Sequence, residues 1–357
     1  MIKLFFRQFA IVIGASSLLF TACKKETTDT VEPIKLSASA DSIMAATTSS
    51  TSLLAGSSLQ LGINGHPLGD KPYLAVSATK QISMLNNMNM TWYRVDMLSQ
   101  ADGTITVPTL LDPLLSAAAA GNVKILPMLN PRTLDYNDSE ANSYKKGKTL
   151  GANFASKYAK YFTYYELGND LDLRVLLPNT TGQSQAHYDR KKFNTLAAYL
   201  KGMDEGLKSK DADAKTMISA GWLHYGFLRM CDWYGVKFDV VAYHWYSDME
   251  AAAPKSPNNI PDITKKLGSL FPKKPIWFTE FNYRYKSSST TNESDQQTFV
   301  KNFINKCKAN AQVKVAIVYE LFDEPAKTGA EASYGIMKWA TQFTVWKNKL
   351  VASLLGN

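Results

Sequence analysis

Two apolar stretches of the chain each end in a carboxylic acid. Residues 274–282, KPIWFTEFN, contain Glu280 near their end, and residues 164–170, YYELGND, close on Asp170. A buried carboxylate is costly unless it is paired or hydrogen-bonded, so an acid at the end of an apolar strand needs a reason. Two strands that deliver carboxyl groups to one face would supply the two acids that glycosidic bond hydrolysis requires.

The elements that must position these acids alternate regularly between strand-like and helix-like patterns. Strands are expected over residues 59–64, 90–95, 123–128, 162–168, 216–221, 238–244, 275–280 and 313–320. Helices are expected over 74–88, 109–120, 190–208, 263–270 and 295–309, with a last helical stretch after Met337. Alternation of this kind implies parallel strands joined by crossover helices.

This pattern predicts an α/β fold, a (β/α)8 TIM barrel over residues 58–357, because eight strands in about 300 residues match that architecture. A doubly wound open sheet is the alternative. No G-x-G-x-x-G motif follows the first strand, which argues against a dinucleotide-binding sheet of that kind.

Polar side chains stand at the end of every expected strand, which indicates a pocket at the carboxyl ends of the barrel, where such barrels carry their chemistry. In chain order these residues are Asn64 and His66; Arg94 and Asp96; Asn130 and Arg132; Glu166, Asn169, Asp170 and Asp172; Trp222 and His224; His244, Trp245 and Tyr246; Glu280 and Asn282; Glu320, Asp323 and Glu324.

Several of these motifs, in their order, resemble the clan GH-A glycoside hydrolases, which are retaining glycosidases on a (β/α)8 barrel. Asn169-Asp170 stands where the clan has Asn-Glu, and Thr279-Glu280-Phe281 stands at the nucleophile strand. His244-Trp245-Tyr246 matches the clan's His-x-Tyr, and Arg94 matches the arginine of its second strand. The resemblance covers residues 58 to about 340.

The resemblance implies roles for these residues. Glu280 would be the nucleophile and Asp170 the acid/base, with a pKa raised by burial or by Glu280 so that it holds a proton. Asn169 would bond the sugar 2-hydroxyl. Arg94 and Tyr246 would keep the attacking carboxylate ionised, and His244 would support the site. The expected reaction is hydrolysis, with retention, of a β-linked or α-L-arabinosyl glycan.

Asp170 departs from the clan's pattern because it is one methylene shorter than Glu. Proton transfer needs hydrogen-bond reach, so three outcomes stay open. Asp170 acts as the acid; another acid such as Asp172, Glu166 or Glu324 replaces it; or the protein binds glycans without cleaving them, as a surface lipoprotein on a degenerate barrel.

Further substrate contacts are expected from polar and aromatic residues at the strand ends. Asn64 and His66 could bond sugar hydroxyls, and Trp222, Trp245 and Tyr283 could stack on the apolar faces of sugar rings. For the aromatic residues, core packing is an equal alternative. Neither a cofactor nor a metal is expected, because His66, His224 and His244 have no metal-binding spacing.

The N-terminus resembles a bacterial lipoprotein leader. Lys3 and Arg7 precede an apolar run over about residues 9–20, and Thr21-Ala22 precede Cys23, the expected lipidation site. Residues 1–22 would be the signal peptide. Residues 23–57 would be a flexible tether, since 14 of the 32 residues from Thr27 to Ser58 are Ser or Thr. The expected location is the cell envelope, lipid-anchored at the outer membrane or cell surface.

The overall charge and the cysteines restrict the partners. The net charge of +9 is a mild excess suited to anionic glycans or a membrane surface, and the chain has no basic run typical of nucleic-acid binding. An oligo- or polysaccharide is the expected substrate and a monomer the expected state. Cys231 and Cys307 could pair, but two unrelated cysteines are more often separate buried thiols.

Overall fold

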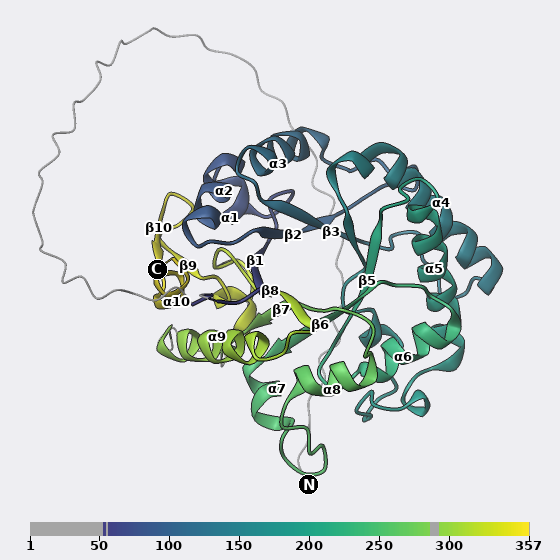
Figure 1. The fold of residues 1–357 in the computed structure, drawn as a ribbon. Coiled ribbons are helices and arrows are strands. Elements are labelled where there is room, and N and C mark those ends of the chain that lie inside the picture. Colours follow the sequence, from purple (N-terminus) through teal and green to yellow (C-terminus); the bar gives the residue numbers. More distant parts are fainter. Residues whose placement is uncertain (1–52, 55, 286–292, 357) are drawn as a thin grey trace, which may run out of the picture. The chain divides into compact units, whose positions relative to one another are not determined.

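The computed structural model describes residues 53–54, 56–285 and 293–356, and its central feature is a closed barrel of eight parallel strands (Figure 1). Each strand pairs with the next, and β8 pairs with β1, which confirms the predicted (β/α)8 architecture. The strands are β1 Gln60–Gly65, β2 Trp92–Met97, β3 Lys124–Leu129, β4 Tyr164–Leu167, β5 Lys215–Gly221, β6 Val240–Tyr246, β7 Ile276–Asn282 and β8 Val313–Val318.

Helices connect the strands along the outside of the barrel. They are α1 Lys71–Leu74, α2 Ala78–Asn87, α3 Pro108–Ala120, α4 Glu140–Tyr158, α5 Arg190–Lys208, α6 Tyr225–Tyr234, α7 Ser247–Ala252, α8 Ile263–Leu270, α9 Glu293–Lys308 and α10 Leu350–Leu355. Short 3-10 helices are η1 Ala159–Tyr161, η2 Leu171–Arg174, η3 Gln185–His187 and η4 Gly329–Ser333. The expected bounds of α5 and α8 match those observed.

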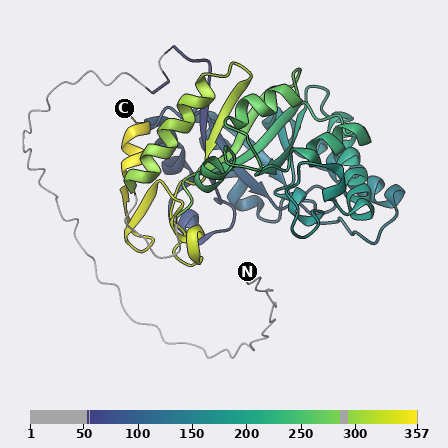
Figure 2. The ribbon, with the colours of Figure 1, turned by 90° about the horizontal axis from the view of Figure 1, so that it is seen from below.

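The segment after Met337 corrects the sequence prediction, because a β-hairpin comes before the last helix. β9 Met337–Thr341 pairs antiparallel with β10 Val345–Asn348, and only then does α10 begin. The hairpin is held by aromatic packing: Trp339 stacks on Phe322 at a ring distance of 5.3 Å and meets Trp346 edge-on. Helix α10 then lies beside α9 (Figure 2).

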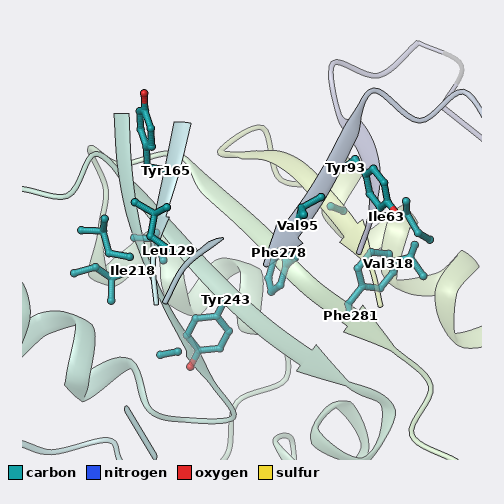
Figure 3. Close-up of a cluster of buried hydrophobic side chains, with 14 of the residues drawn as sticks. Ile63, Tyr93, Val95, Leu129, Tyr165, Ile218, Tyr243, Phe278, Phe281 and Val318 are labelled. Atoms are coloured by element: carbon teal, nitrogen blue, oxygen red, sulfur yellow. The ribbon is translucent and has the colours of Figure 1, made fainter. Parts of the chain in front are cut away.

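Two hydrophobic clusters stabilise the barrel, one inside it and one around it. Inside, Trp92, Tyr164 and Trp277 pack against one another with ring distances between 4.6 and 5.5 Å and fill the amino-terminal end. Outside, side chains of alternate strand positions pack under the helices; Figure 3 shows Ile63, Tyr93, Leu129, Tyr165, Ile218, Tyr243, Phe278 and Val318 among them. The filled lower half leaves the carboxyl end of the interior for polar side chains.

The predicted leader and Cys23 lie outside the described residues, as does nearly all of the predicted tether. Within the part of the chain that the structure describes, no helix has the length and apolar character needed to cross a membrane. Cys231 and Cys307 are separate, fully buried thiols, so the alternative that they pair is wrong.

Helices α4 and α5 lie side by side with their backbones in close approach (Figure 1). Each carries two glycines four residues apart, Gly147 and Gly151 on α4 and Gly202 and Gly206 on α5. A Cβ at any of them would overlap a backbone carbonyl of the facing helix, that of Tyr144 in the case of Gly202. These helices follow β3 and β4, so the contact fixes the neighbourhood of the strand that carries Glu166.

Gly202→Ala should therefore destabilise the protein, although alanine favours helices by about 1 kcal/mol over glycine. Overpacking against backbone should cost about 1–3 kcal/mol, measured as the free energy of unfolding in urea. Gly268→Ala in α8 is the matched control, because its added Cβ would meet only the end of the Gln312 side chain. Equal stabilities for the two variants would contradict the close approach.

Candidate active site

A buried arginine on β2 organises the carboxyl end of the barrel. The Arg94 side chain is 3% exposed. Its Nε and Nη2 donate to the two oxygens of Glu166 at 2.5 and 3.1 Å. Its Nη1 donates to Glu280 Oε1 and to Asn64 Oδ1, both at 2.8 Å, and Nη2 also donates to Asn169 Oδ1 at 2.6 Å. One guanidinium thus joins side chains of β1, β4 and β7.

Glu280 reaches this network through a bulge in β7. The β6–β7 register pairs Tyr243 with Phe278 but His244 with Glu280, so β7 has one extra residue at this point. Phe278 and Phe281 both pack outward on Phe303, although they are three residues apart. The bulge therefore turns Thr279 and Glu280 both toward the interior, where Thr279 donates to Glu166.

Glu280 is held from two sides. Its Oε1 accepts from Arg94, and its Oε2 accepts from the Tyr246 hydroxyl at 2.9 Å. The residue is 6% exposed, yet it lines the cavities described below. The two donors fix the orientation of both carboxyl oxygens.

Glu166 has no access to solvent and forms an ion pair with Arg94. Burial alone would raise the pKa of Glu166, but the charge and hydrogen bonds of Arg94 and the nearby His244 lower it to about 2. A carboxyl group that stays ionised cannot deliver a proton near neutral pH. Glu166 is therefore not a candidate for the acid.

His244 stands among three carboxylates. Its Nδ1 lies 2.8 Å from Asp170 Oδ1 and 3.7 Å from Glu280 Oε2, and its Nε2 lies 3.8 Å from Glu166 Oε1. Burial disfavours the imidazolium, but the charges of Glu280 and Asp170 outweigh it and raise the pKa of His244 to about 10. The imidazole is therefore protonated at neutral pH.

Asp170 has a left-handed backbone, with φ 48° and ψ 37°, and its side chain is 40% exposed. It accepts hydrogen bonds from His244 and, at 3.1 Å, from Asn169 Nδ2. Burial raises the pKa of Asp170, but the attraction and hydrogen bond of His244 outweigh it, and the pKa lies below the ordinary value. The expectation of a raised pKa for this acid is therefore wrong for the unliganded site.

Two adjoining cavities meet at these carboxylates. The first, of about 390 Å³, is lined by Trp222, His224, His244 and Tyr246; we call it the β5–β6 cavity. The second, of about 560 Å³, is lined by His66, Arg94, Asp96 and Asn130; we call it the β1–β3 cavity. Both include Asn169, Asp170 and Glu280. A molecule that spans the two cavities would pass over both acids.

Comparison with known proteins agrees with this geometry. Residues 91–335, more than half of the chain, match the model of the family described as glycosyl hydrolase catalytic core. The chain belongs to this family. The matched segment runs from the start of β2 to just beyond η4, so it contains Arg94, Asp170, His244 and Glu280. No curated protein sequence matches the chain.

Solved structures share the fold of this glycosyl hydrolase core at low sequence identity. A family 1 β-glucosidase from Thermotoga maritima has a TM-score of 0.59 and 10% identity, over 84% of this chain and 97% of that one. The same organism's β-glucosidase in complex with deoxynojirimycin gives the same values. The AHE enzyme from Alicyclobacillus herbarius has a TM-score of 0.59 and 9% identity, over 84% and 96%. These similarities confirm the (β/α)8 barrel fold.

Three residues that were predicted to touch substrate line neither cavity of this glycosyl hydrolase core. Asn64 is 2% exposed, and its amide donates to the carbonyls of Thr279 and Val318 while it accepts from Arg94, so it supports the arginine. Trp245 is 1% exposed because β6 turns it outward, opposite to His244 and Tyr246. Tyr283 lines neither cavity and packs edge-on against Tyr285.

The other predicted contacts do reach a cavity. Trp222 lines the β5–β6 cavity and stacks on Trp245 with rings 6.3 Å apart, so Trp245 acts as its support. His66 lines the β1–β3 cavity, with Nδ1 2.6 Å from Asp96 and Nε2 3.2 Å from Glu320. Asn169, Arg94, His244 and Tyr246 line one or both cavities.

Of the remaining alternative acids, only Asp172 lines a cavity. Glu324 is 2% exposed and ion-paired with Lys327. Burial and the nearby Glu320 charge raise the pKa of Glu324 to about 8, but it lines neither cavity. Asp172 lines the β5–β6 cavity and is bonded to His224. This pairing escaped the sequence analysis, since nothing in the spacing of the two residues connects β4 to β5.

His66 belongs to a group of side chains that does not include the other two strand-end histidines. In the described ranges, one group of three side chains could approach a cation together, namely His66, Asp70 and Glu324. Lys327 is ion-paired with Glu324, and its Nζ lies 3.8 Å from Asp70. The ammonium group thus already supplies positive charge to this cluster.

Arg94→Met should destabilise the protein by about 3–5 kcal/mol at pH 7, because it leaves buried Glu166 without its cation. A lowered carboxyl pKa stabilises the fold above the unfolded value, and that stability is lost as pH falls toward about 2. The penalty should therefore be smaller at pH 4 than at pH 7, as urea unfolding would measure. Arg174→Met, at an exposed arginine of the β1–β3 cavity, is the control; a similar penalty there would refute the assignment.

Proposed function

We propose that the protein is a retaining glycoside hydrolase that cleaves a β-linked or α-L-arabinosyl glycan by double displacement. The observation that carries the proposal is the placement of Glu280 between Arg94 and Tyr246, beside the Asp170–His244 pair and at the junction of two cavities. The family match supports glycoside hydrolysis as the reaction class.

Glu280 is the nucleophile in this proposal. Its two oxygens accept hydrogen bonds from Arg94 and Tyr246, which orient the carboxyl group for attack on an anomeric carbon. The hydroxyl of Tyr246 and the guanidinium of Arg94 also interact with the negative charge that Glu280 loses when the covalent bond forms. Asn169, beside them, is placed to bond the sugar 2-hydroxyl.

The spacing of the acids favours retention. His244 Nδ1 lies 2.8 Å from an oxygen of Asp170 and 3.7 Å from an oxygen of Glu280, so these oxygens are no further apart than the sum of the two distances. This maximum separation of the two oxygens is about as short as the shortest carboxyl separation in inverting enzymes. Those enzymes have roughly 6.5–9.5 Å between their carboxyl groups because they need room for a water. Retaining enzymes have a shorter separation, of about 5–5.5 Å.

The acid in this proposal is the Asp170–His244 pair. In the unliganded site the proton lies on His244, 2.8 Å from Asp170, and the left-handed backbone of Asp170 presents its carboxyl group to the cleft. The two groups share one hydrogen bond, so the proton in that bond belongs to the pair. The pair supplies that proton to the leaving oxygen and takes one back from the attacking water.

The substrate assignment is supported by the solved relatives and by the size of the cleft. Structures of Thermotoga maritima β-glucosidase share the fold, which supports a β-linked substrate. The two cavities have about 390 and 560 Å³, within the range typical of small-molecule sites, so the cleft can hold sugar units on both sides of the acids. An oligo- or polysaccharide is the proposed partner, and a monomer is the state we expect.

A non-catalytic glycan-binding protein is the second candidate, and one observation favours it. Asp170 is shorter than the Glu that the clan uses, and His244 holds its pKa below the ordinary value. A carboxylate in that state binds sugar hydroxyls well but donates no proton. Measured turnover separates the two functions.

Substitutions at the two acids test the proposed mechanism. Glu280→Gln should reduce turnover at least about 10³-fold while the fold is kept, because covalent attack is lost. Asp170→Asn should slow substrates with poor leaving groups far more than activated aryl glycosides, and azide should restore deglycosylation in that variant alone. Rates on aryl glycosides and on polysaccharides, with thermal melting as a folding control, provide the measurement.

Other results of these experiments would contradict the assigned roles. Wild-type turnover in Glu280→Gln would exclude that nucleophile. If Asp170→Asn leaves both substrate types unaffected, the acid lies elsewhere. If the wild type binds glycans and cleaves none, the protein is the non-catalytic binder, and Asp170→Glu then tests whether the missing methylene is the cause.

We also propose that the mature protein is anchored to the cell envelope by lipid on Cys23, since the leader pattern is that of a bacterial lipoprotein. Cys23→Ser should release the protein from membranes with no change in melting temperature, because the predicted tether separates anchor from barrel. One acyl chain binds membranes weakly, so stable attachment needs more than one. Membrane fractionation checks this, and a variant that stays membrane-bound would exclude lipidation at Cys23.

A further inference from the structure

The inference rests on the proposed function. Different residues surround the two cavities of the cleft, and this difference indicates which cavity holds the leaving group. Asn169 and Asp170 line both cavities, but their partners do not. Asn169 Oδ1 accepts from Arg94, which lines the β1–β3 cavity alone, and Asp170 is bonded to His244, which lines the β5–β6 cavity alone. The proton that the Asp170–His244 pair gives to the leaving oxygen therefore comes from the β5–β6 side. The leaving group belongs in the β5–β6 cavity.

A second carboxylate–histidine pair stands in that cavity, separate from the Asp170–His244 pair. Asp172 Oδ2 lies 2.5 Å from His224 Nδ1, with the residues 1% and 5% exposed. With Asp172 as the acceptor, Nδ1 is the donor of this hydrogen bond. Among the described residues, Nε2 of His224 has no hydrogen-bond partner, although His224 lines the cavity. The arrangement keeps one ring nitrogen available to a ligand.

The ring of His224 is fixed by neighbours on both flanks. Gly182, with φ of 74°, passes so close that an added Cβ would overlap Cδ2 of the ring. The backbone amide of Gly221 lies 3.4 Å from Asp172 Oδ2, and the carbonyl of His224 accepts from Tyr188. Loops after β4 and β5 thus clamp the imidazole. A side chain held in this way can contribute a hydrogen bond with little loss of rotamer entropy.

The walls around His224 suit a sugar. Trp222 and Met249 give apolar surface for the C–H face of a ring, and Arg284 and Glu331 give polar groups at the rim. Trp222 is itself supported by Trp245 and by a hydrogen bond from Tyr243 to its carbonyl. A small or purely apolar leaving group would leave His224 unused.

We propose that His224, oriented by Asp172, binds a hydroxyl of the sugar unit in the leaving-group position, so that the natural substrate has a saccharide on both sides of the cleaved bond. The site then selects oligo- and polysaccharides over glycosides with small aglycones. His224 acts in recognition, while Asp170 and Glu280 carry the chemistry.

Two substitutions of His224 separate its two nitrogens. His224→Asn keeps an amide near Nδ1 for Asp172 and removes the group at Nε2; His224→Gln places an amide near Nε2. The probes are the 4-nitrophenyl glycoside of the sugar that the wild type cleaves fastest and the unsubstituted disaccharide of that sugar. Titration calorimetry with the disaccharide and the monosaccharide in the Glu280→Gln background gives affinity without turnover.

We expect His224→Asn to lower kcat/KM for the disaccharide about tenfold, the effect of one lost hydrogen bond, and to lower it less for the aryl glycoside. His224→Gln should recover part of the loss, and Asp172→Asn should resemble His224→Asn. The disaccharide affinity in the Glu280→Gln background should fall about tenfold as well, with a smaller change for the monosaccharide. The control His187→Asn, on η3 and lining neither cavity, should behave as wild type.

Other outcomes overturn the inference or the proposed function separately. Equal losses on both probes, or a lowered melting temperature that explains them, would make the Asp172–His224 pair structural. No change on either probe would exclude recognition by His224. Affinity that depends on His224 in a protein without turnover would retain this site but refute the hydrolase. Absence of glycan binding in wild type and Glu280→Gln alike would refute both.

Discussion

The structure at the carboxyl end of the barrel depends on one buried cation. Arg94 brings a full positive charge to a position that is 3% exposed, where it would be costly without partners. Glu166 and Glu280 supply two negative charges, and Asn64 and Asn169 accept its remaining donors. Burial disfavours the charged guanidinium, yet the two carboxylates raise the pKa of Arg94 above its ordinary value. Only a planar guanidinium, with several donors in a fixed geometry, can form hydrogen bonds to side chains of β1, β4 and β7 together. Lysine therefore could not replace Arg94.

This network in turn sets the chemistry of its neighbours. Burial disfavours a charged His244, but the charges of Glu280 and Asp170 outweigh it, so His244 is an imidazolium with a pKa of about 10. The imidazolium then binds Asp170 and lowers the pKa of that carboxyl. A protonated imidazole thus lies next to Asp170 and is hydrogen-bonded to it. A shorter acid in a left-handed backbone is compatible with such a site, because its histidine partner lies within hydrogen-bond distance.

The barrel makes these contacts possible by dividing its interior into layers. Trp92, Tyr164 and Trp277 pack against one another in the layer at the amino-terminal end of the barrel. Above them, residues two positions along the same strands face inward, as Arg94 does above Trp92. The bulge in β7 adds Glu280 to this layer by turning two consecutive residues inward. Without it, a strand with strict alternation would turn Glu280 toward α9.

The sequence by itself determined the barrel, its strand order and most of the polar residues at the strand ends, because alternating apolar runs and helical patterns are local signals. It also determined that Glu280, Asp170, Arg94 and His244 belong to one site, through motifs that each sit at a strand end. The tertiary structure decided what each residue touches. Trp245 faces the core, Asn64 supports Arg94, and Asp172 meets His224, because strand orientation, the β7 bulge and the close approach of neighbouring loops arise from packing between segments far apart in the chain.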